Sequence, residues 1–108
     1  ETTLGKACIL SAGPYRIDNL RIEAYAVYTN KTMTGAMRGF GAPQVCFAYE
    51  SQMDEIAAAL HMDPLEIRLL NAFEEGAASP TGQVLQSVVL KDSLLKAAER
   101  FGWKEPQS

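Results

Sequence analysis

The sequence predicts an α+β fold in which a leading helix, a strand, a glycine-rich loop, a helix pair and a closing helix follow one another. Apolar residues recur at helical spacing in residues 4–12 and 44–60, and cap and stop signals indicate a further helix at 92–101. Residues 20–29 instead alternate with a period of two, which is typical of a half-buried strand. Glycines gather in residues 35–44, between the strand and the longest helix.

The leading helix, Leu4–Ala12, should end at Gly13 and Pro14, because glycine accepts a left-handed cap and proline cannot continue the helix. The strand is expected at Leu20–Thr29, with two faces made by alternate residues. One strand makes no sheet by itself, so this segment needs partners. Together with a first residue, Glu1, that is not Met, this need leads us to expect a fragment of a larger domain.

The helix pair is expected at Gln44–Leu60 and Asp63–Asn71. The first helix carries a buried apolar stripe, and Pro43 lies in its first turn, where proline is tolerated. Asp63 should cap the second helix, with Pro64 at its first position and Glu66 at the capping-box spacing.

The last third should begin with a loop at 74–82 and an extended stretch at 83–89. We expect Asp92 to cap the closing helix, which runs to Phe101 and stops at Gly102.

Composition and charge exclude several classes of protein. The 108 residues are 47% hydrophobic and 21% charged, with a net charge of −3, so no basic field attracts nucleic acid or anionic lipid. No apolar run is long enough to span a membrane. Cys8 and Cys46 are too few for a zinc or iron–sulfur site, so we interpret them as small apolar side chains in a reducing cytoplasm, and the lone His61 is given no role. We therefore expect a cytoplasmic location, and no nucleic-acid or membrane partner.

The glycine-rich loop, residues 35–44, is the one segment whose composition suggests a functional role. Its glycines allow close approach of the backbone to a ligand, and the loop leads into a helix N-terminus that favours an anion. Arg38 adds a permanent charge, and Phe40 lies between two glycines. Glycine turns before helices are also common, and a nearby Phe usually fills a core. The residues alone therefore leave both ligand binding and a structural turn open.

The loop closely resembles a signature of the molybdenum hydroxylases, the xanthine dehydrogenase and aldehyde oxidase family. The matching stretch is Gly35-Ala36-Met37-Arg38-Gly39-Phe40-Gly41-Ala42-Pro43-Gln44. Upstream, Gly13-Pro14-Tyr15-Arg16-Ile17 and Tyr28-Thr29-Asn30 also resemble the family, as do Glu50–Ala57, Met62–Arg68, Thr81–Leu85 and Ala97–Trp103 downstream. The resemblance covers nearly the whole chain. It implies that residues 1–108 are one fragment of a larger molybdopterin-binding domain: a helix and strand at 1–34, the cofactor and substrate loop at 35–44, and a helical part at 45–108.

The resemblance also implies roles for the loop residues. Arg38 and Gly39 would bind the molybdopterin cofactor, and Phe40 would pack against a flat heteroaromatic or aldehyde substrate. Gly39 and Gly41 would let the backbone lie beside the cofactor. No catalytic residue and no metal ligand is assigned to this chain, because the family's catalytic glutamate lies elsewhere in its long subunit.

The implied reaction is hydroxylation with water-derived oxygen, catalysed by the full subunit and not by the isolated chain. It requires a molybdenum–molybdopterin cofactor, whose cytosine dinucleotide form is common in bacterial members, with iron–sulfur clusters and FAD elsewhere in the enzyme. The implied partners are the rest of the large subunit, iron–sulfur and flavin subunits or domains, and a small-molecule substrate.

Two departures from the family pattern bear on the substrate. Met37 replaces an aromatic residue that is common in the family, and Lys6 lies near the position of the substrate-contacting arginine of xanthine-type enzymes. Because lysine lacks the two-pronged arginine fork, this departure argues against xanthine itself as the substrate. A second hypothesis is a stand-alone helical interaction module, in which helix Gln44–Leu60 docks a partner and the glycine loop is only a turn.

Overall fold

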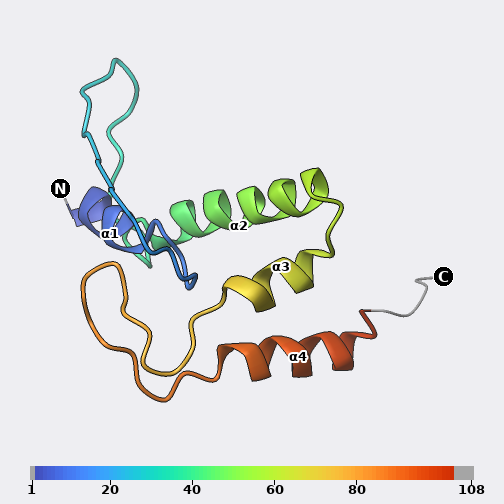
Figure 1. The fold of residues 1–108 in the computed structure, drawn as a ribbon. Helices are drawn as coiled ribbons and strands as arrows, with labels where there is room; N and C mark the ends of the chain where they lie inside the picture. The colour runs from blue at the N-terminus through green and yellow to red at the C-terminus, as the bar shows by residue number, and fades with distance from the viewer. Residues whose placement is uncertain (1, 104–108) are drawn as a thin grey trace.

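The computed structural model describes residues 2–103 and contains four helices in that range (Figure 1). They are α1 (Thr2–Leu10), α2 (Ala42–Ala59), α3 (Pro64–Asn71) and α4 (Leu90–Phe101). In Figure 1, α2, α3 and α4 lie one below another in alternating directions, and α1 lies at the beginning of α2. This arrangement places the glycine-rich loop between α1 and the first turn of α2.

The ends of the helices follow the expected chemistry closely. Gly13 has a positive φ of 64° after α1, and Gly102 has a left-handed conformation after α4. The Asp63 side chain accepts hydrogen bonds from the amides of Leu65 and Glu66 at 2.7 and 3.2 Å, which confirms its role as the N-cap of α3. The predicted leading helix, helix pair and closing helix are therefore confirmed.

The prediction of a strand at Leu20–Thr29 is wrong for this structure. The segment is extended but irregular, and it projects away from the helices (Figure 1). Within the described residues, none of its backbone groups forms a hydrogen bond with another backbone group. Alternating side chains favour an extended backbone, but a ladder requires a neighbouring strand, and the described part of the chain provides none.

Residues 74–89 form an irregular hairpin in place of the predicted loop and extended stretch. Ala78 and Val84 form an isolated antiparallel bridge, and Leu85 N–H donates to the Ala77 carbonyl at 2.9 Å. The predicted capping by Asp92 is also wrong, because α4 begins at Leu90 and Asp92 lies inside its first turn. The turn before α4 is held instead by the Glu75 carboxylate, which accepts hydrogen bonds from the amides of Ser87 and Val88.

The hydrophobic core is small for a chain of this length. The buried apolar residues of the described part are Ala12, Tyr15, Ala57, Ile67 and Ala72. The radius of gyration is 16.3 Å, whereas a compact domain of this length has about 13 Å. The surface is 8840 Å², against roughly 5,900 Å² for a compact monomer of this mass. Much apolar surface is therefore uncovered. No helix in the described range is long and apolar enough to cross a membrane.

Candidate functional site

The glycine-rich loop is a succession of tight turns that ends in the first turn of α2. The Phe40 amide donates to the Met37 carbonyl at 2.8 Å, and the Ala42 amide donates to the Gly39 carbonyl at 3.0 Å. Gly39, Phe40 and Gly41 have φ values of 94°, 47° and 101°. A positive φ is uncommon for a phenylalanine, so the turn holds Phe40 in an unusual backbone conformation. The residue as a whole remains 46% exposed.

The two glycines beside Phe40 have close neighbours within the chain itself. A Cβ at Gly39 would lie 2.6 Å from Cδ of Pro43. A Cβ at Gly41 would lie 2.2 Å from the carbonyl oxygen of Thr3 in α1. The requirement for glycine at both positions is therefore explained by packing inside this chain, and the glycines alone do not indicate a ligand.

Arg38 is exposed, and no ion pair or hydrogen bond of its side chain is found within the described residues. The amides of Gly39, Gly41 and Gln44 also lack an acceptor in the described range, while Val45 N–H donates to the Gly41 carbonyl at 3.3 Å. These groups are donors only, one of them permanently charged. Donors of this kind beside a helix N-terminus fit an anionic group such as a phosphate.

A polar cluster that the sequence did not suggest joins the turn after α1 to α2 and α3. The Tyr15 hydroxyl donates to the Glu50 carboxylate at 2.8 Å, and Arg68 Nε donates to the same carboxylate at 2.8 Å. Arg68 also pairs with Asp54 at 2.8 Å and donates to the carbonyl oxygens of Pro64 and Glu50. The spacing of Glu50 and Asp54, four residues apart on one helix face, was the available signal. The cluster therefore holds α2 and α3 and the turn after α1 together, and the glycine-rich loop leads into the first turn of α2.

Burial and charge shift the proton affinities in this region. Burial, with the hydrogen bond to Glu50, holds the pKa of Tyr15 well above its usual range. Burial also raises the pKa of Tyr49 to about 12, with a further contribution from Cys46. Burial opposes the charge on Arg68, but its bonds to Glu50 and Asp54 outweigh burial and raise its pKa. Both phenols are therefore neutral, and Arg68 charged, at neutral pH.

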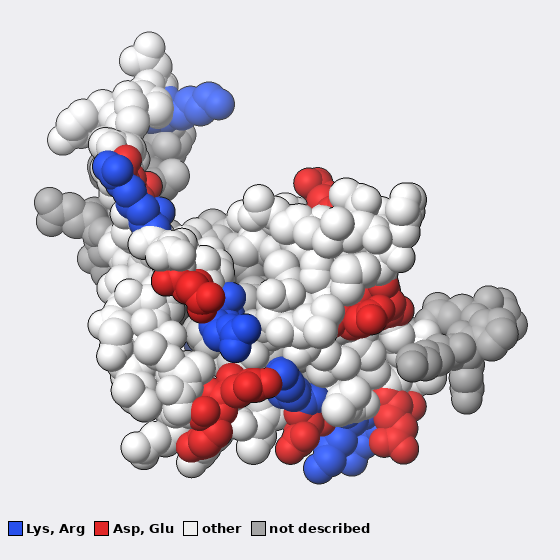
Figure 2. Space-filling view, viewed as in Figure 1, with Lys and Arg blue, Asp and Glu red and all other residues white. Residues whose placement is uncertain are grey.

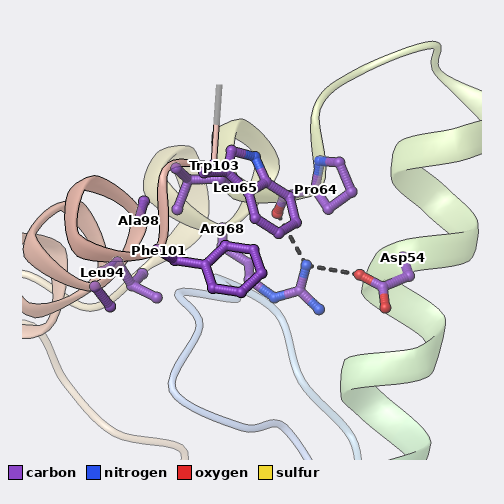
Figure 3. Close-up of a pocket in the computed structure, with 9 residues that line it drawn as sticks. Asp54, Pro64, Leu65, Arg68, Leu94, Ala98, Phe101 and Trp103 are labelled. Carbon is purple, nitrogen blue, oxygen red and sulfur yellow. Dashed lines mark hydrogen bonds and ion pairs between the residues drawn. The ribbon is translucent and has the colours of Figure 1, made fainter. Parts of the chain in front are cut away.

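A cleft of about 610 Å³ lies between α3 and α4 (Figure 3), and no residue of the glycine-rich loop lines it. Leu65, Leu94, Ala98, Phe101 and Trp103 give it an apolar lining, with the Arg68–Asp54 pair at one end. Trp103 Nε1 donates to the Asp63 carboxylate at 2.9 Å, which ties the end of α4 to the start of α3. The cleft contains none of the residues for which the sequence suggested a ligand.

Charge is unevenly distributed over the face drawn in Figure 2. Charged side chains gather along α4 and on the projecting segment, whereas the broad surface over α2 carries few of them. Exposed apolar side chains also lie on α2, among them Phe47, which is 77% exposed. A helix with such side chains in water usually has further chain or a partner packed against it.

Comparison with known families identifies the first two thirds of the chain. Residues 1–72 match the model of the molybdopterin cofactor-binding domain. The chain belongs to the molybdopterin cofactor-binding domain family. Arg38, Gly39 and Phe40 lie within the matched range, as do Tyr15, Glu50 and Arg68, while α4 lies beyond it.

Curated relatives of this molybdopterin-binding segment include several large oxidoreductase subunits. The chain is 50% identical over 96 residues to the nicotinate dehydrogenase large molybdopterin subunit of Eubacterium barkeri, covering 88% of this chain and 23% of that protein. It is 52% identical over 79 residues to a putative xanthine dehydrogenase molybdenum-binding subunit of Escherichia coli, covering 72% of this chain and 10% of that protein. It is 45% identical over 92 residues to the aldehyde oxidoreductase of Megalodesulfovibrio gigas, covering 85% of this chain and 10% of that protein. The chain thus spans less than a quarter of the length of each of these relatives.

Proposed function

We propose that this chain is a segment of the large subunit of a molybdenum-dependent hydroxylase, and that it contributes the loop that contacts cofactor and substrate. The match of residues 1–72 to the molybdopterin cofactor-binding domain carries this proposal. The large uncovered apolar surface supports it, because the rest of a subunit would cover that surface. The comparisons give no corresponding support to a stand-alone interaction module.

Arg38 is the residue we propose for holding the cofactor's anionic part, together with the amides around Gly39. Its exposed guanidinium and the loop amides that have no acceptor within the described residues support this role. When bound, the molybdenum cofactor supplies the redox centre for hydroxylation. The pterin form, iron–sulfur clusters and FAD belong to the proposal for the whole enzyme, as do its other subunits or domains.

Phe40 is the residue we propose for contact with the substrate. Its positive φ and flanking turns hold the ring outside the small core, where a flat molecule can pack against it. An edge-to-face or offset contact between rings contributes about 0.5–1.5 kcal/mol and orients the substrate. The substrates we propose are heteroaromatic or aldehyde compounds, and no residue of this segment is assigned a catalytic role. The isolated chain should accordingly be inactive.

The test is a pair of substitutions in the complete enzyme, with molybdenum content and steady-state kinetics measured on several heteroaromatic and aldehyde substrates. Arg38→Ala should lower molybdenum occupancy and affect every substrate alike. Phe40→Ala should keep molybdenum near normal and change kcat/KM by amounts that differ among substrates. If Phe40→Ala lost the metal while Arg38→Ala changed only substrate preference, the two roles would be reversed.

A further inference from the structure

The contact between α1 and the glycine-rich loop is made by backbone atoms of Thr3 and Ala7 and by the Cβ of Ala7. The position of a Cβ on Gly41 is taken by the Thr3 carbonyl oxygen at 2.2 Å, with the Cβ and amide nitrogen of Ala7 at 3.1 and 3.2 Å. Real Cβ atoms do not approach other atoms as closely as 2.2 Å, and a helix carbonyl cannot rotate away as a side chain can. Gly41 is buried although Arg38 and Phe40 are exposed. The helix therefore lies directly against the loop.

A second glycine makes the matching contact at the other end of α1. A Cβ at Gly13 would lie 2.8 Å from the ring of Tyr49, which belongs to α2. The ring of Tyr15 packs edge-on against the same Tyr49 ring, with centroids 6.3 Å apart, and its hydroxyl bonds to Glu50. The segment from α1 to Tyr15 is thus held against α2 at two places. It cannot shift relative to the loop without breaking one of them.

From these contacts we infer that α1 is a positioning element for Phe40, with Gly41 and Ala7 as its contact residues. Phe40 directly precedes Gly41, and its φ of 47° is maintained by turns on both sides. A side chain at residue 41 must push the loop away from α1, because the opposing atom is a backbone carbonyl. That displacement would turn the Phe40 ring while leaving Arg38, three residues earlier, free to reach its ligand. The inference rests on the proposed function, since it concerns how the substrate-contacting residue is held.

The experiment compares Gly41→Ala with two control substitutions in the complete holoenzyme. Gly82 has a positive φ of 81° but no atom within 4 Å of an added Cβ, so Gly82→Ala reproduces the backbone strain without the clash. Gly5→Ala places a Cβ in α1 where nothing lies within 4 Å. Ala7→Leu presses on the same contact from the side of α1, which provides a second variant if Gly41→Ala does not fold.

The readouts are molybdenum content and the ratios of kcat/KM among several substrates, a quantity that a general loss of stability does not alter. Gly41→Ala and Ala7→Leu should retain molybdenum. They should change the kcat/KM ratios about tenfold and rank the substrates in the same order as Phe40→Ala does, because misplacement by about 1 Å can lower a rate on the order of 100-fold. Gly82→Ala and Gly5→Ala should leave the ratios unchanged. If Phe40→Ala alters the ratios and Gly41→Ala and Ala7→Leu do not, the positioning role is wrong. If Phe40→Ala itself leaves them unchanged, the proposed function of the loop is wrong.

Discussion

Tyr15 and Ala72 face each other across an isolated antiparallel bridge that joins the turn after α1 to the end of α3. Arg16 N–H donates to the Asn71 carbonyl at 2.8 Å, and Phe73 N–H donates to the Pro14 carbonyl at 3.0 Å. The Tyr15 side chain is buried, and its hydroxyl anchors this bridge to Glu50 on α2. The bridge and the Tyr15 hydroxyl together therefore join three segments that are distant in sequence.

Removing the Tyr15 hydroxyl should loosen this bridge. A hydrogen bond to a charged group contributes about 1.5–3 kcal/mol, so Tyr15→Phe should speed exchange of the Arg16 and Phe73 amides about tenfold or more. Hydrogen exchange of the complete subunit checks this, with Tyr25→Phe as the control, because the Tyr25 ring is exposed. Unchanged exchange at both amides would show that the bridge does not depend on the hydroxyl.

Arg68 and Glu50 should contribute jointly to the free energy of unfolding, because the two paired side chains are only 16% and 33% exposed. The test is a double-mutant cycle in which the free energy of unfolding is measured for Glu50→Ala, Arg68→Ala and the double variant. The coupling energy between the two residues should be about 1–3 kcal/mol, between the values for surface and buried pairs. The matched control is the exposed Arg21–Glu23 pair, for which no measurable coupling is expected. Equal couplings for the two pairs would contradict this account of the cluster.

The Asp63 side chain should contribute more to helix stability than Asp92. Asp63 accepts two amide hydrogen bonds at the start of α3, whereas Asp92 lies inside the first turn of α4 with no capping bond. Asp63→Ala should destabilise α3 by about 1 kcal/mol through the lost cap, and it also removes the acceptor of the Trp103 indole N–H at the end of α4. Asp92→Ala should destabilise α4 by only about 0.3–1 kcal/mol through the helix dipole. Amide exchange in the two helices distinguishes the effects, and a larger loss for Asp92→Ala would contradict the observed caps.

Stability should fall at alkaline pH because the phenols of Tyr15 and Tyr49 resist ionisation in the folded state. Burial raises the pKa of Tyr49 from 10.0 to about 12, and the pKa of Tyr15 is also raised. Between these values the unfolded chain loses phenol protons that the folded chain keeps, so ionisation favours unfolding. The contribution of the two protonated phenols to the free energy of unfolding is fully present below about pH 10 and is lost as the pH rises toward 12. Thermal denaturation of wild type and the Tyr15→Phe/Tyr49→Phe variant checks this: the variant should lose less stability over this range.

The helices, the Asp63 cap of α3 and the glycines that follow α1 and α4 could be predicted from the sequence because their signals are local, whereas the predicted Asp92 cap of α4 was wrong. Proline, glycine and aspartate mark the ends of α1, α3 and α4 within a few residues of each end. The error at Leu20–Thr29 has a different origin. A period of two describes the side chains of a strand, but the ladder also needs a neighbour in space, which the described residues do not provide.

The candidate site was predictable in part for the same reason. The local sequence indicates the loop with Arg38 and Phe40, whereas the contact between Gly41 and Thr3 depends on how α1 packs. The bond between Tyr15 and Glu50 spans 35 residues, so no local pattern reveals it. Tertiary packing decides these features. It also shows that Gly39 and Gly41 have close neighbours inside this chain, which is the structural-turn alternative that the residues alone had left open beside ligand binding.

We propose that Arg38 holds the molybdenum cofactor, and this role can be tested directly. The most direct measurement is molybdenum and pterin content per complete large subunit for wild type, Arg38→Ala and Arg21→Ala. Arg21 is an exposed arginine outside the loop, so its substitution controls for a general loss of charge. Wild type and Arg21→Ala should contain both molybdenum and pterin in stoichiometric amounts, and folded Arg38→Ala should contain substantially less of both. Full occupancy in folded Arg38→Ala would contradict this role.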